Sequence, residues 1–457
     1  MDFDVCIIGA GLAGSEAALQ LAERGVRVFV AEARPYLMGP VHKTGLCAEL
    51  VCSNSLKSLR EDSAAGMLKH ELDALGSHLY CTALDHRVAA GGALAVDRTA
   101  FSQAVTDQLE SSELIGLVRK EACSVDGEGT VTFADGTHAG PFSAIVVATG
   151  PLTSDSLASW LSGLTGTESL SFYDAAAPIV LSETLDREKL FSQSRYEEGE
   201  GDYLNAPLSC EEYDAFIDAL VHAKRALSKD FEHSELFQAC QPIEEVARAG
   251  HDAPRFGTMK PVGLVDPATG KRPWAALQLR AEDTHCQSYN LVGCQTNLTF
   301  PEQKRVFRMI PGLEHAEFAR YGVMHRNTFL DAPRVMDRTQ RIAEFPTPLF
   351  LAGQVSGTEG YCEAIRSGLQ AALEVFACVK GIPTPQLPKH TAYGALLAYA
   401  TCTDTKDYQP MHVNFGIMEP LDPPVRNKGL RKQAYAERGR EALDSYLGAL
   451  SERGLLP

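Results

Sequence analysis

Residues 5–32 read VCIIGAGLAGSEAALQLAERGVRVFVAE, and this stretch decides the fold. The apolar run at its start predicts a strand buried in a parallel sheet, and residues 15–24 have the apolar spacing that predicts a helix. Gly25 suits the end of that helix, and residues 26–30 predict a second strand. A strand, a helix and a strand in this order form the βαβ unit of dinucleotide-binding folds.

Three glycines in the turn between the first strand and the helix indicate where a dinucleotide would lie. Gly9 permits a tight turn, Gly11 lets the backbone approach a pyrophosphate, and Gly14 lets the helix pack closely on the strand. The helix start offers free N–H groups to the phosphates. Glu32, 18 residues after Gly14, is placed to accept a hydrogen bond from a ribose hydroxyl. The predicted cofactor-binding residues here are Gly9, Ala10, Gly11, Leu12, Ala13, Gly14 and Glu32.

Two later apolar runs favour FAD as the dinucleotide. Residues 144–150 predict a strand that ends in Thr-Gly, and residues 349–354 predict another that leads into a helix at 364–376. This late segment resembles the one that seats the flavin in FAD-linked oxidoreductases, although an ordinary βα unit gives the same pattern. The sequence has no second GxGxxG motif, so any nicotinamide reductant must dock transiently. The predicted FAD contacts from these runs are Thr149, Gly150, Gly353, Gln354, Gly360 and Tyr361.

Composition and charge limit the classes of protein to which the chain belongs. Its 457 residues are 45% hydrophobic and 22% charged, an ordinary globular balance. The sequence has neither a run of about 18 apolar residues nor a secretory signal, which predicts a cytoplasmic protein without a membrane span. The 12 cysteines show no regular spacing and read as reduced thiols. A net charge of −17 argues against a surface coated in basic residues for nucleic acid.

The middle of the chain does not follow a nucleotide-binding pattern. The predicted elements there are a hairpin at 130–136, a helix at 210–226, and strands at 260–264, 275–280 and 289–292. We therefore predict the α/β class, with a Rossmann-like FAD-binding domain that is interrupted by an inserted α/β domain. The expected domains are 1–205 for the first part of the FAD-binding domain, 206–330 for the inserted domain with Cys240, and 331–457 for the last part and the C-terminal helices.

Two of the cysteines lie in a sequence context that suits a reactive thiol. Cys52 is followed by small polar residues that could begin a helix, and Cys240 precedes Pro242 by two residues. A thiol near a helix N-terminus has a lowered pKa and reacts more readily, but most free cysteines are simply small buried hydrophobes. The polar run 321–328 suits either a loop at a site or a hydrogen-bonded turn. The spacing of the histidines matches no metal site, and no HExxH motif occurs.

Several segments along the chain are long and specific enough to indicate a family. They are 8–18, 48–56, 172–180, 199–205, 259–273, 302–327 and 409–416. Through them the chain closely resembles, over nearly its whole length, the folate- and FAD-dependent tRNA (uracil-5-)-methyltransferases of the TrmFO family. The GidA/MnmG flavoproteins are a larger sister family that shares the opening fold. They lack the block at 48–56 and carry a long helical C-terminal domain.

The resemblance implies an enzyme of RNA modification. In this family a methylene group passes by way of the flavin from 5,10-methylenetetrahydrofolate to carbon 5 of uridine 54 in the T-arm of tRNA, and NAD(P)H supplies the reducing equivalents. Carbon 5 becomes nucleophilic when a thiolate adds to carbon 6 of the uracil. The resemblance implies that Cys240 is that nucleophile and that Cys52 is a second thiol, which assists proton removal or protects the nucleophile. The two roles could be reversed.

The sequence leaves two other functions open: the same chemistry on a ribosomal RNA uridine, and a flavin oxidoreductase that acts on a small molecule. Asn297 stands where the family has a histidine placed to stack on the folate, and Ala239 stands where it has a glycine. An acidic protein can still hold a basic strip, so we expect modest, localised and salt-sensitive RNA affinity. Candidate phosphate contacts, each also explained as an ordinary solvated residue, are Lys271, Arg272, Lys304, Arg305, Arg308, Arg426, Lys428, Arg431 and Lys432.

Overall fold

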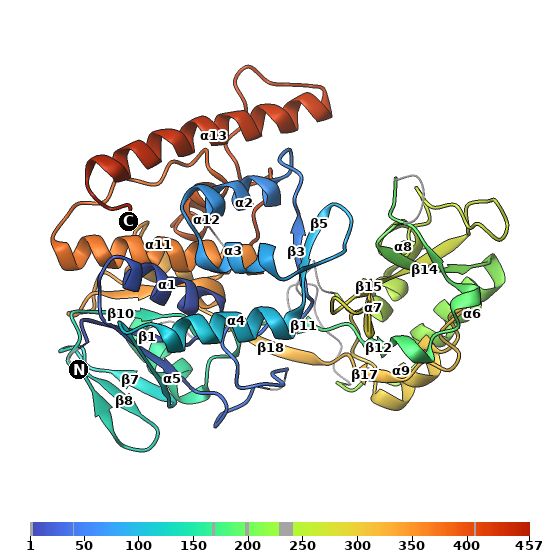
Figure 1. Ribbon diagram of the computed structural model, residues 1–457, viewed down its shortest axis with the longest axis horizontal. Helices are drawn as coiled ribbons and strands as arrows, with labels where there is room; N and C mark the ends of the chain where they lie inside the picture. The colour runs from blue at the N-terminus through green and yellow to red at the C-terminus, as the bar shows by residue number, and fades with distance from the viewer. Residues whose placement is uncertain (1–2, 40, 167–169, 197–200, 228–240, 406–407) are drawn as a thin grey trace.

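The computed structural model has two lobes (Figure 1). The structure describes residues 3–39, 41–166, 170–196, 201–227, 241–405 and 408–457. The larger lobe holds both ends of the chain and a parallel sheet, and the smaller lobe holds a second, antiparallel sheet. Each lobe has its own cluster of buried apolar side chains, as expected of two separate domains.

The larger lobe is built on a five-stranded parallel sheet in the order β19-β10-β1-β2-β6. Its strands are β1 (Val5–Ile8), β2 (Val28–Glu32), β6 (Ile115–Arg119), β10 (Ala144–Val147) and β19 (Leu349–Leu351). β1 lies in the middle, between β2 and β10, and all of its residues are buried. Apolar runs such as VCII and AIVV suit this position because helices cover both faces of a parallel sheet. The predicted α/β class with a Rossmann-like domain is confirmed.

Two helices from opposite parts of the chain pack together against this sheet (Figure 1). Helix α1 (Leu12–Glu23) follows β1, and α11 (Tyr361–Lys380) follows β19. A Cβ atom on Gly368 of α11 would lie 2.1 Å from the carbonyl oxygen of Ala13, so this close crossing requires glycine. The other helices of this lobe are α2 (Ala64–Ala74), α3 (His78–Asp85), α4 (Arg98–Ser111), α5 (Asp155–Thr165), α10 (Ala332–Val335), α12 (Ala392–Ala400) and α13 (Lys428–Glu452).

Two three-stranded antiparallel sheets complete the larger lobe. The first consists of β3 (Ser55–Ser58), β5 (Ala93–Val96) and β4 (Arg87–Val88). The second consists of β7 (Ala122–Val125), β8 (Val131–Phe133) and β9 (His138–Ala139). β8 and β9 form the hairpin predicted at 130–136, with Gly136 in its turn at a φ of +78°.

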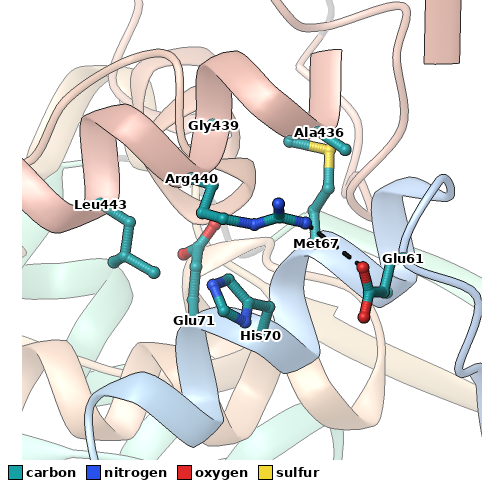
Figure 2. A pocket seen from close by; sticks show the side chains of 9 residues that line it. Glu61, Met67, His70, Glu71, Ala436, Gly439, Arg440 and Leu443 are labelled. Atoms are coloured by element: carbon teal, nitrogen blue, oxygen red, sulfur yellow. Dashed lines mark hydrogen bonds and ion pairs between the residues drawn. The ribbon is translucent and has the colours of Figure 1, made fainter. Parts of the chain in front are cut away.

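The long C-terminal helix α13 lies across α2 (Figures 1 and 2). The helices approach closely at Gly439, where an added Cβ would lie 2.6 Å from Cε of Met67. Figure 2 shows Arg440 of α13 reaching Glu61, with which it pairs at 3.3 Å. The cavity beside this pair has a volume of about 20 Å³, which is room for a water molecule but not for a substrate.

The smaller lobe is a six-stranded antiparallel sheet with short helices. Its strands, in sheet order, are β13 (Phe191–Ser192), β14 (Tyr203–Leu208), β15 (Ala275–Ala281), β16 (Ser288–Leu291), β12 (Ile179–Leu181) and β17 (Phe318–Arg320). Its helices are α6 (Cys210–His222), α7 (Ile243–Ala249), α8 (Ala253–Phe256) and α9 (Phe300–Phe307). α6 begins with a capping box between Ser209 and Glu212, so the helix start predicted at residue 210 is confirmed.

Two paired strands connect the lobes. β11 (Leu170–Ala175) leads into the smaller lobe, β18 (Met324–Phe329) leads back, and the two are antiparallel. The boundary predicted at residue 206 falls inside β14, and β12 and β13 precede it in the same sheet. We therefore propose that the inserted domain spans 176–323. The sequence gives no periodic signal for the start of the inserted domain before residue 206, because β12 and β13 have only three and two residues.

Two predicted elements of the smaller lobe differ in the structure. Residues 260–264 form turns instead of a strand, because Pro261 has no N–H for a ladder and Gly263 has a φ of +85°. The helix predicted to reach residue 226 ends at His222, and Arg225 pairs with Leu298 in an isolated bridge. The strands predicted at 275–280 and 289–292 are confirmed as β15 and β16.

Among the described residues, no helix combines the length and the hydrophobicity that crossing a bilayer requires. In the same part of the chain, no three His, Cys, Asp or Glu side chains gather as metal ligands would. The eleven cysteines that the structure describes are all free thiols, as the sequence predicts.

Candidate active site

The glycine-rich turn at 9–14 follows the carboxyl end of β1. Gly9 has a φ of +100°, and a Cβ on Gly14 would lie 1.9 Å from the Gly9 carbonyl oxygen, so both positions require glycine. At Gly11 the nearest atom to an added Cβ is the carbonyl oxygen of Ala148, 3.9 Å away. The protein itself therefore leaves space beside Gly11. This geometry fits a pyrophosphate at that point, ahead of the buried first turn of α1 with Leu12 and Ala13.

Glu32 ends β2 as a buried carboxylate with several donors. Its Oε2 accepts the backbone N–H of Ala10 at 2.7 Å, and its Oε1 accepts Nε of Arg34 at 2.8 Å and the Arg34 backbone N–H at 3.0 Å. Burial by itself would raise the pKa of Glu32, but Arg34 and the hydrogen bonds outweigh burial and hold this pKa below its usual value. The carboxylate is therefore ionised and has lone pairs left for ribose hydroxyls. Arg34, which sequence reasoning missed, also contacts Glu49 at 3.4 Å.

β10 and β19 both end in turns that need glycine. Gly150, directly after Thr149, begins a short 3-10 helix with a φ of +66°, and Gly353 begins another with a φ of +76°. In the second turn the side-chain amide of Gln354 donates to the carboxyl group of Glu359. Burial raises the pKa of Glu359 to about 8, so this carboxyl group keeps its proton at neutral pH and can act as a donor. Sequence reasoning did not single out Glu359.

The start of α11 holds the loop that carries Cys52. Gly360 precedes the helix with a φ of +118°, and the hydroxyl oxygen of Tyr361 accepts the backbone N–H groups of Cys52 at 2.9 Å and Ser53 at 3.2 Å. Segments more than 300 positions apart are thus joined at one point. The composition of the residues after Cys52 suggests the start of a helix, but in the structure they do not form one. Instead they run into β3 at Ser55, which pairs with β5.

Cys52 lies half-buried where the two lobes meet. Its Sγ is 3.9 Å from the carbonyl oxygen of Ala175, the last residue of β11. Two arginines fix the backbone just before it: Arg98 donates to the Leu50 carbonyl at 2.7 Å, and Arg320 donates to the Val51 carbonyl at 2.7 Å. The loop of Cys52 is therefore held by residues from both lobes, and its thiol lies at the contact between them.

Strand β18 carries buried polar groups toward two of the turns predicted to bind the cofactor. The polar run 321–328, for which the sequence suggests a loop or a turn, largely forms this strand, which packs against the turns at Gly150 and Gly353. Within the described chain, Nδ1 of His325 and both amide atoms of Asn327 are buried without a hydrogen-bond partner. Burial and the charge of Arg320 lower the pKa of His325 to about 4, so its ring is neutral. Buried polar atoms without partners cost about 1–3 kcal/mol each, so these groups fit contacts with a polar ligand.

Cys240, the other predicted catalytic cysteine, lies outside the described residues, as does Ala239. Helix α7 begins three residues after it, at Ile243, whose backbone N–H donates to the Gln295 carbonyl at 2.7 Å. The carboxylate of Glu244 accepts the backbone N–H of Asn297 at 2.6 Å. The described chain that follows Cys240 is therefore anchored to the segment 295–297.

Asn297 stands where the resemblance leads us to expect a histidine, and both its side-chain oxygen and its side-chain nitrogen form hydrogen bonds within the smaller lobe. Its side-chain oxygen accepts the Leu227 backbone N–H at 3.1 Å, and its amide nitrogen donates to the Leu227 carbonyl at 3.0 Å. Cys294 is buried, and burial raises the pKa of its thiol. Both side chains therefore serve the packing of the lobe, and Asn297 holds the end of the described segment before Cys240.

The candidate contacts lie along one edge of the parallel sheet. Glu32 is the last residue of β2, and the turn at 9–14, Gly150 and Gly353 follow β1, β10 and β19. The four strands are neighbours in the order β2, β1, β10 and β19. Strands lie about 4.8 Å apart, so these ends span roughly 14 Å. This row suits an elongated dinucleotide: Glu32 would accept from a ribose, Gly11 would let a pyrophosphate approach, and the turn at Gly353 and strand β18 would lie near a ring system. The residues present therefore fit FAD.

Comparison with known proteins agrees with this geometry. The family described as Glucose inhibited division protein A matches residues 4–383. The chain is 49% identical to the methylenetetrahydrofolate--tRNA-(uracil-5-)-methyltransferase TrmFO of Thermosynechococcus vestitus, over 98% of this chain and 95% of that protein. It is 48% identical to the TrmFO of Geobacter sulfurreducens, over 98% of this chain and 99% of that protein. Aquifex aeolicus GidA shares the fold, with a TM-score of 0.71, 18% identity, and coverage of 99% of this chain and 78% of that one.

Proposed function

This chain belongs to the Glucose inhibited division protein A family and, within it, to the TrmFO enzymes, and on that premise we propose that it methylates carbon 5 of a uridine in tRNA. We propose uridine 54 of the T-loop as the target, 5,10-methylenetetrahydrofolate as the carbon donor, FAD as the cofactor and NAD(P)H as the reductant. The compartment that we propose is the cytoplasm.

One observation carries the proposal: the first residue of α11 binds the loop of Cys52. The Tyr361 hydroxyl accepts two N–H groups of that loop, while the residues just before Tyr361 belong to the turns proposed to hold FAD. A thiol with this position lies beside the cofactor and can act on the same substrate. A flavin oxidoreductase for small molecules would not require such a thiol at the contact between two lobes.

The thiols supply what the uracil needs. A thiolate adds to carbon 6, and the electron pair of the carbon 5–carbon 6 bond becomes an enolate that bonds the one-carbon unit through carbon 5. A second group then takes the proton from carbon 5, the bond between the one-carbon unit and its carrier nitrogen breaks, and the carrier leaves as an amine. Hydride adds to the methylene group that remains on carbon 5, and elimination of the thiolate breaks the sulfur–carbon 6 bond and restores the ring double bond. When bound, reduced FAD supplies the electrons that convert a methylene group to a methyl group. We propose Cys240 as the nucleophile and Cys52 as the second thiol.

The test of the activity uses purified, FAD-loaded protein with unmodified tRNA transcript, methylenetetrahydrofolate and NADPH, and 5-methyluridine is measured. We expect product with tRNA. If 5-methyluridine forms only in ribosomal RNA, that RNA is the target. If it forms in neither RNA, the proposal is contradicted. Omitting the folate is the control for the carbon donor.

The test of the two thiols uses tRNA that contains 5-fluorouridine, since fluorine at carbon 5 cannot leave as a proton does and the covalent adduct accumulates. We expect the adduct with Cys52→Ala and none with Cys240→Ala. The opposite pattern would reverse the two roles. Unchanged flavin absorbance in both variants is the control for an intact cofactor site.

A further inference from the structure

The segment 255–274 of the smaller lobe has a charge opposite to that of the whole chain. It reads RFGTMKPVGLVDPATGKRPW and contains four cations but a single acid, Asp266, in a protein of net charge −17. None of its residues takes part in the site described above. Because net charge reports only an average, a local strip of this kind can attract a polyanion.

Two aromatic rings of this segment are exposed around one guanidinium group. Phe256 is 74% exposed and Trp274 is 38% exposed. The guanidinium carbon of Arg255 lies 3.7 Å from the Trp274 ring centre and 5.6 Å from the Phe256 ring centre, and Nε of Arg255 donates to the Trp274 carbonyl at 2.8 Å. The arginine is therefore held in place, and the Phe256 ring remains largely open to solvent. Aromatic faces and guanidinium planes are the groups on which unpaired RNA bases stack.

The cations of this segment lack acidic partners. Among the described residues, no carboxylate lies within ion-pair distance of Arg255, Lys271 or Arg272, whereas Arg305 elsewhere on this lobe pairs with Glu302 at 2.6 Å. Lys271 and Arg272 are also exposed. Positive charges without partners on an acidic protein are available to phosphates, and they release counterions when they bind them.

Strand β15 links this surface to the reactive thiol. Trp274 directly precedes β15, and at the other end of the strand the Ala281 carbonyl accepts the side-chain amide of Asn54 at 3.0 Å. Asn54 is two residues after Cys52. Seven steps of about 3.3 Å place Trp274 roughly 23 Å from that end. A base at Cys52 and a nucleotide at Trp274 can therefore belong to the same folded RNA.

We propose that Arg255, Phe256, Lys271, Arg272 and Trp274, the 255–274 surface, bind the RNA substrate away from its target uridine. The rings stack on an unpaired base, and the cations neutralise the adjoining phosphates. This inference rests on the proposed function, since it names a second place at which the same RNA is held. Stacking selects nucleotides in loops and at ends, because bases inside a duplex do not expose their faces.

The test measures binding of a fluorescent hairpin with the sequence of an unmodified tRNA T-arm to the FAD-loaded protein, by anisotropy over a range of salt concentrations. We expect Phe256→Ala to raise Kd about tenfold, the effect of losing one stacked base. Phe256→Trp keeps a ring and should bind as the parent protein does. Lys271→Ala with Arg272→Ala should flatten the plot of log Kd against log salt by roughly one to two in slope. Lys380→Ala with Lys389→Ala, which removes two lysines of the larger lobe, is the charge-matched control.

Two failures of this test have different meanings. If the parent protein forms 5-methyluridine in RNA but Phe256→Ala and the double variant bind RNA as it does, the 255–274 surface has no such role. If the control double variant flattens the salt plot as much as Lys271→Ala with Arg272→Ala, the effect is one of total charge and the inference is also wrong. If the parent forms no 5-methyluridine, the proposed activity fails, while weaker binding by Phe256→Ala would still support an RNA surface here.

Discussion

Substituting two glycines of the same turn should separate cofactor binding from folding. At Gly11 the nearest protein atom to an added Cβ is 3.9 Å away, and its φ of −73° is accessible to alanine. Gly11→Ala should therefore change the free energy of unfolding of the FAD-free protein by less than about 0.5 kcal/mol, since lost backbone entropy in the unfolded state offsets a poorer helix cap. Its methyl group would occupy the space proposed for the pyrophosphate. We expect FAD affinity to fall at least about tenfold, or 1.4 kcal/mol.

Gly14→Ala should behave in the opposite way. Its Cβ would lie 1.9 Å from the Gly9 carbonyl oxygen, a backbone atom that moves only if α1 shifts from β1. Such overpacking costs about 1–3 kcal/mol or more, while alanine regains about 1 kcal/mol of helix propensity. We expect a loss of roughly 2 kcal/mol of stability even without FAD.

The assay for the pair is urea unfolding of FAD-free protein, followed by far-ultraviolet circular dichroism, together with FAD titration followed by flavin fluorescence. Gly163→Ala is the control, because an added Cβ there meets no atom within 4 Å. The reasoning is wrong if Gly11→Ala binds FAD as the parent does. It is equally wrong if the FAD-free Gly11→Ala protein is destabilised as much as the FAD-free Gly14→Ala protein.

Three further predictions concern buried contacts. Tyr361→Phe should leave the Cys52 N–H without its acceptor and cost about 1–3 kcal/mol in urea unfolding, with slower methylation; an unchanged methylation rate would contradict the positioning role. Burial raises the pKa of Glu244 to about 7, so the protonated form is favoured in the folded state and stability falls as pH rises from about 4.5 to 7. Glu244→Gln should therefore gain stability relative to the parent over that range, as measured by urea unfolding at each pH, and a constant difference would show that Glu244 does not titrate there. Gly368→Ala should cost about 2 kcal/mol or more in urea unfolding, because its Cβ would overlap the Ala13 carbonyl; parent-like stability would show that α11 can shift freely.

The larger lobe is predicted well because its sequence signals are local. The spacing of Gly9, Gly11 and Gly14 specifies a turn whose geometry depends on its own few residues, and the structure has that turn. The capping box at Ser209 likewise fixes the start of α6 from neighbouring residues. In both cases the physical cause of the structure lies within about one turn of helix, where a pattern can report it.

The rest of the candidate site depends on contacts between distant segments. Nothing near Cys52 in sequence indicates that Tyr361 accepts its N–H, or that Arg320 of the smaller lobe fixes the residue before it. The sequence near Asn297 likewise does not indicate that its side-chain amide forms hydrogen bonds with Leu227. The buried face of β18 is the one that packs against the distant turns at Gly150 and Gly353, and only the run of polar side chains at 321–328 gave a signal that polar groups gather there.

The order of strands in the parallel sheet sets an order of events during synthesis. β10 ends at Val147 and its neighbour β19 begins at Leu349, about 200 residues later. At about 5–20 residues per second, a ribosome needs roughly 10–40 s to make that stretch. The whole inserted domain emerges in this interval and can fold while one edge of β10 still has no partner. The proposed FAD site is therefore completed late, when β19 and α11 have been made, and until then a nascent apolar strand edge is exposed to aggregation.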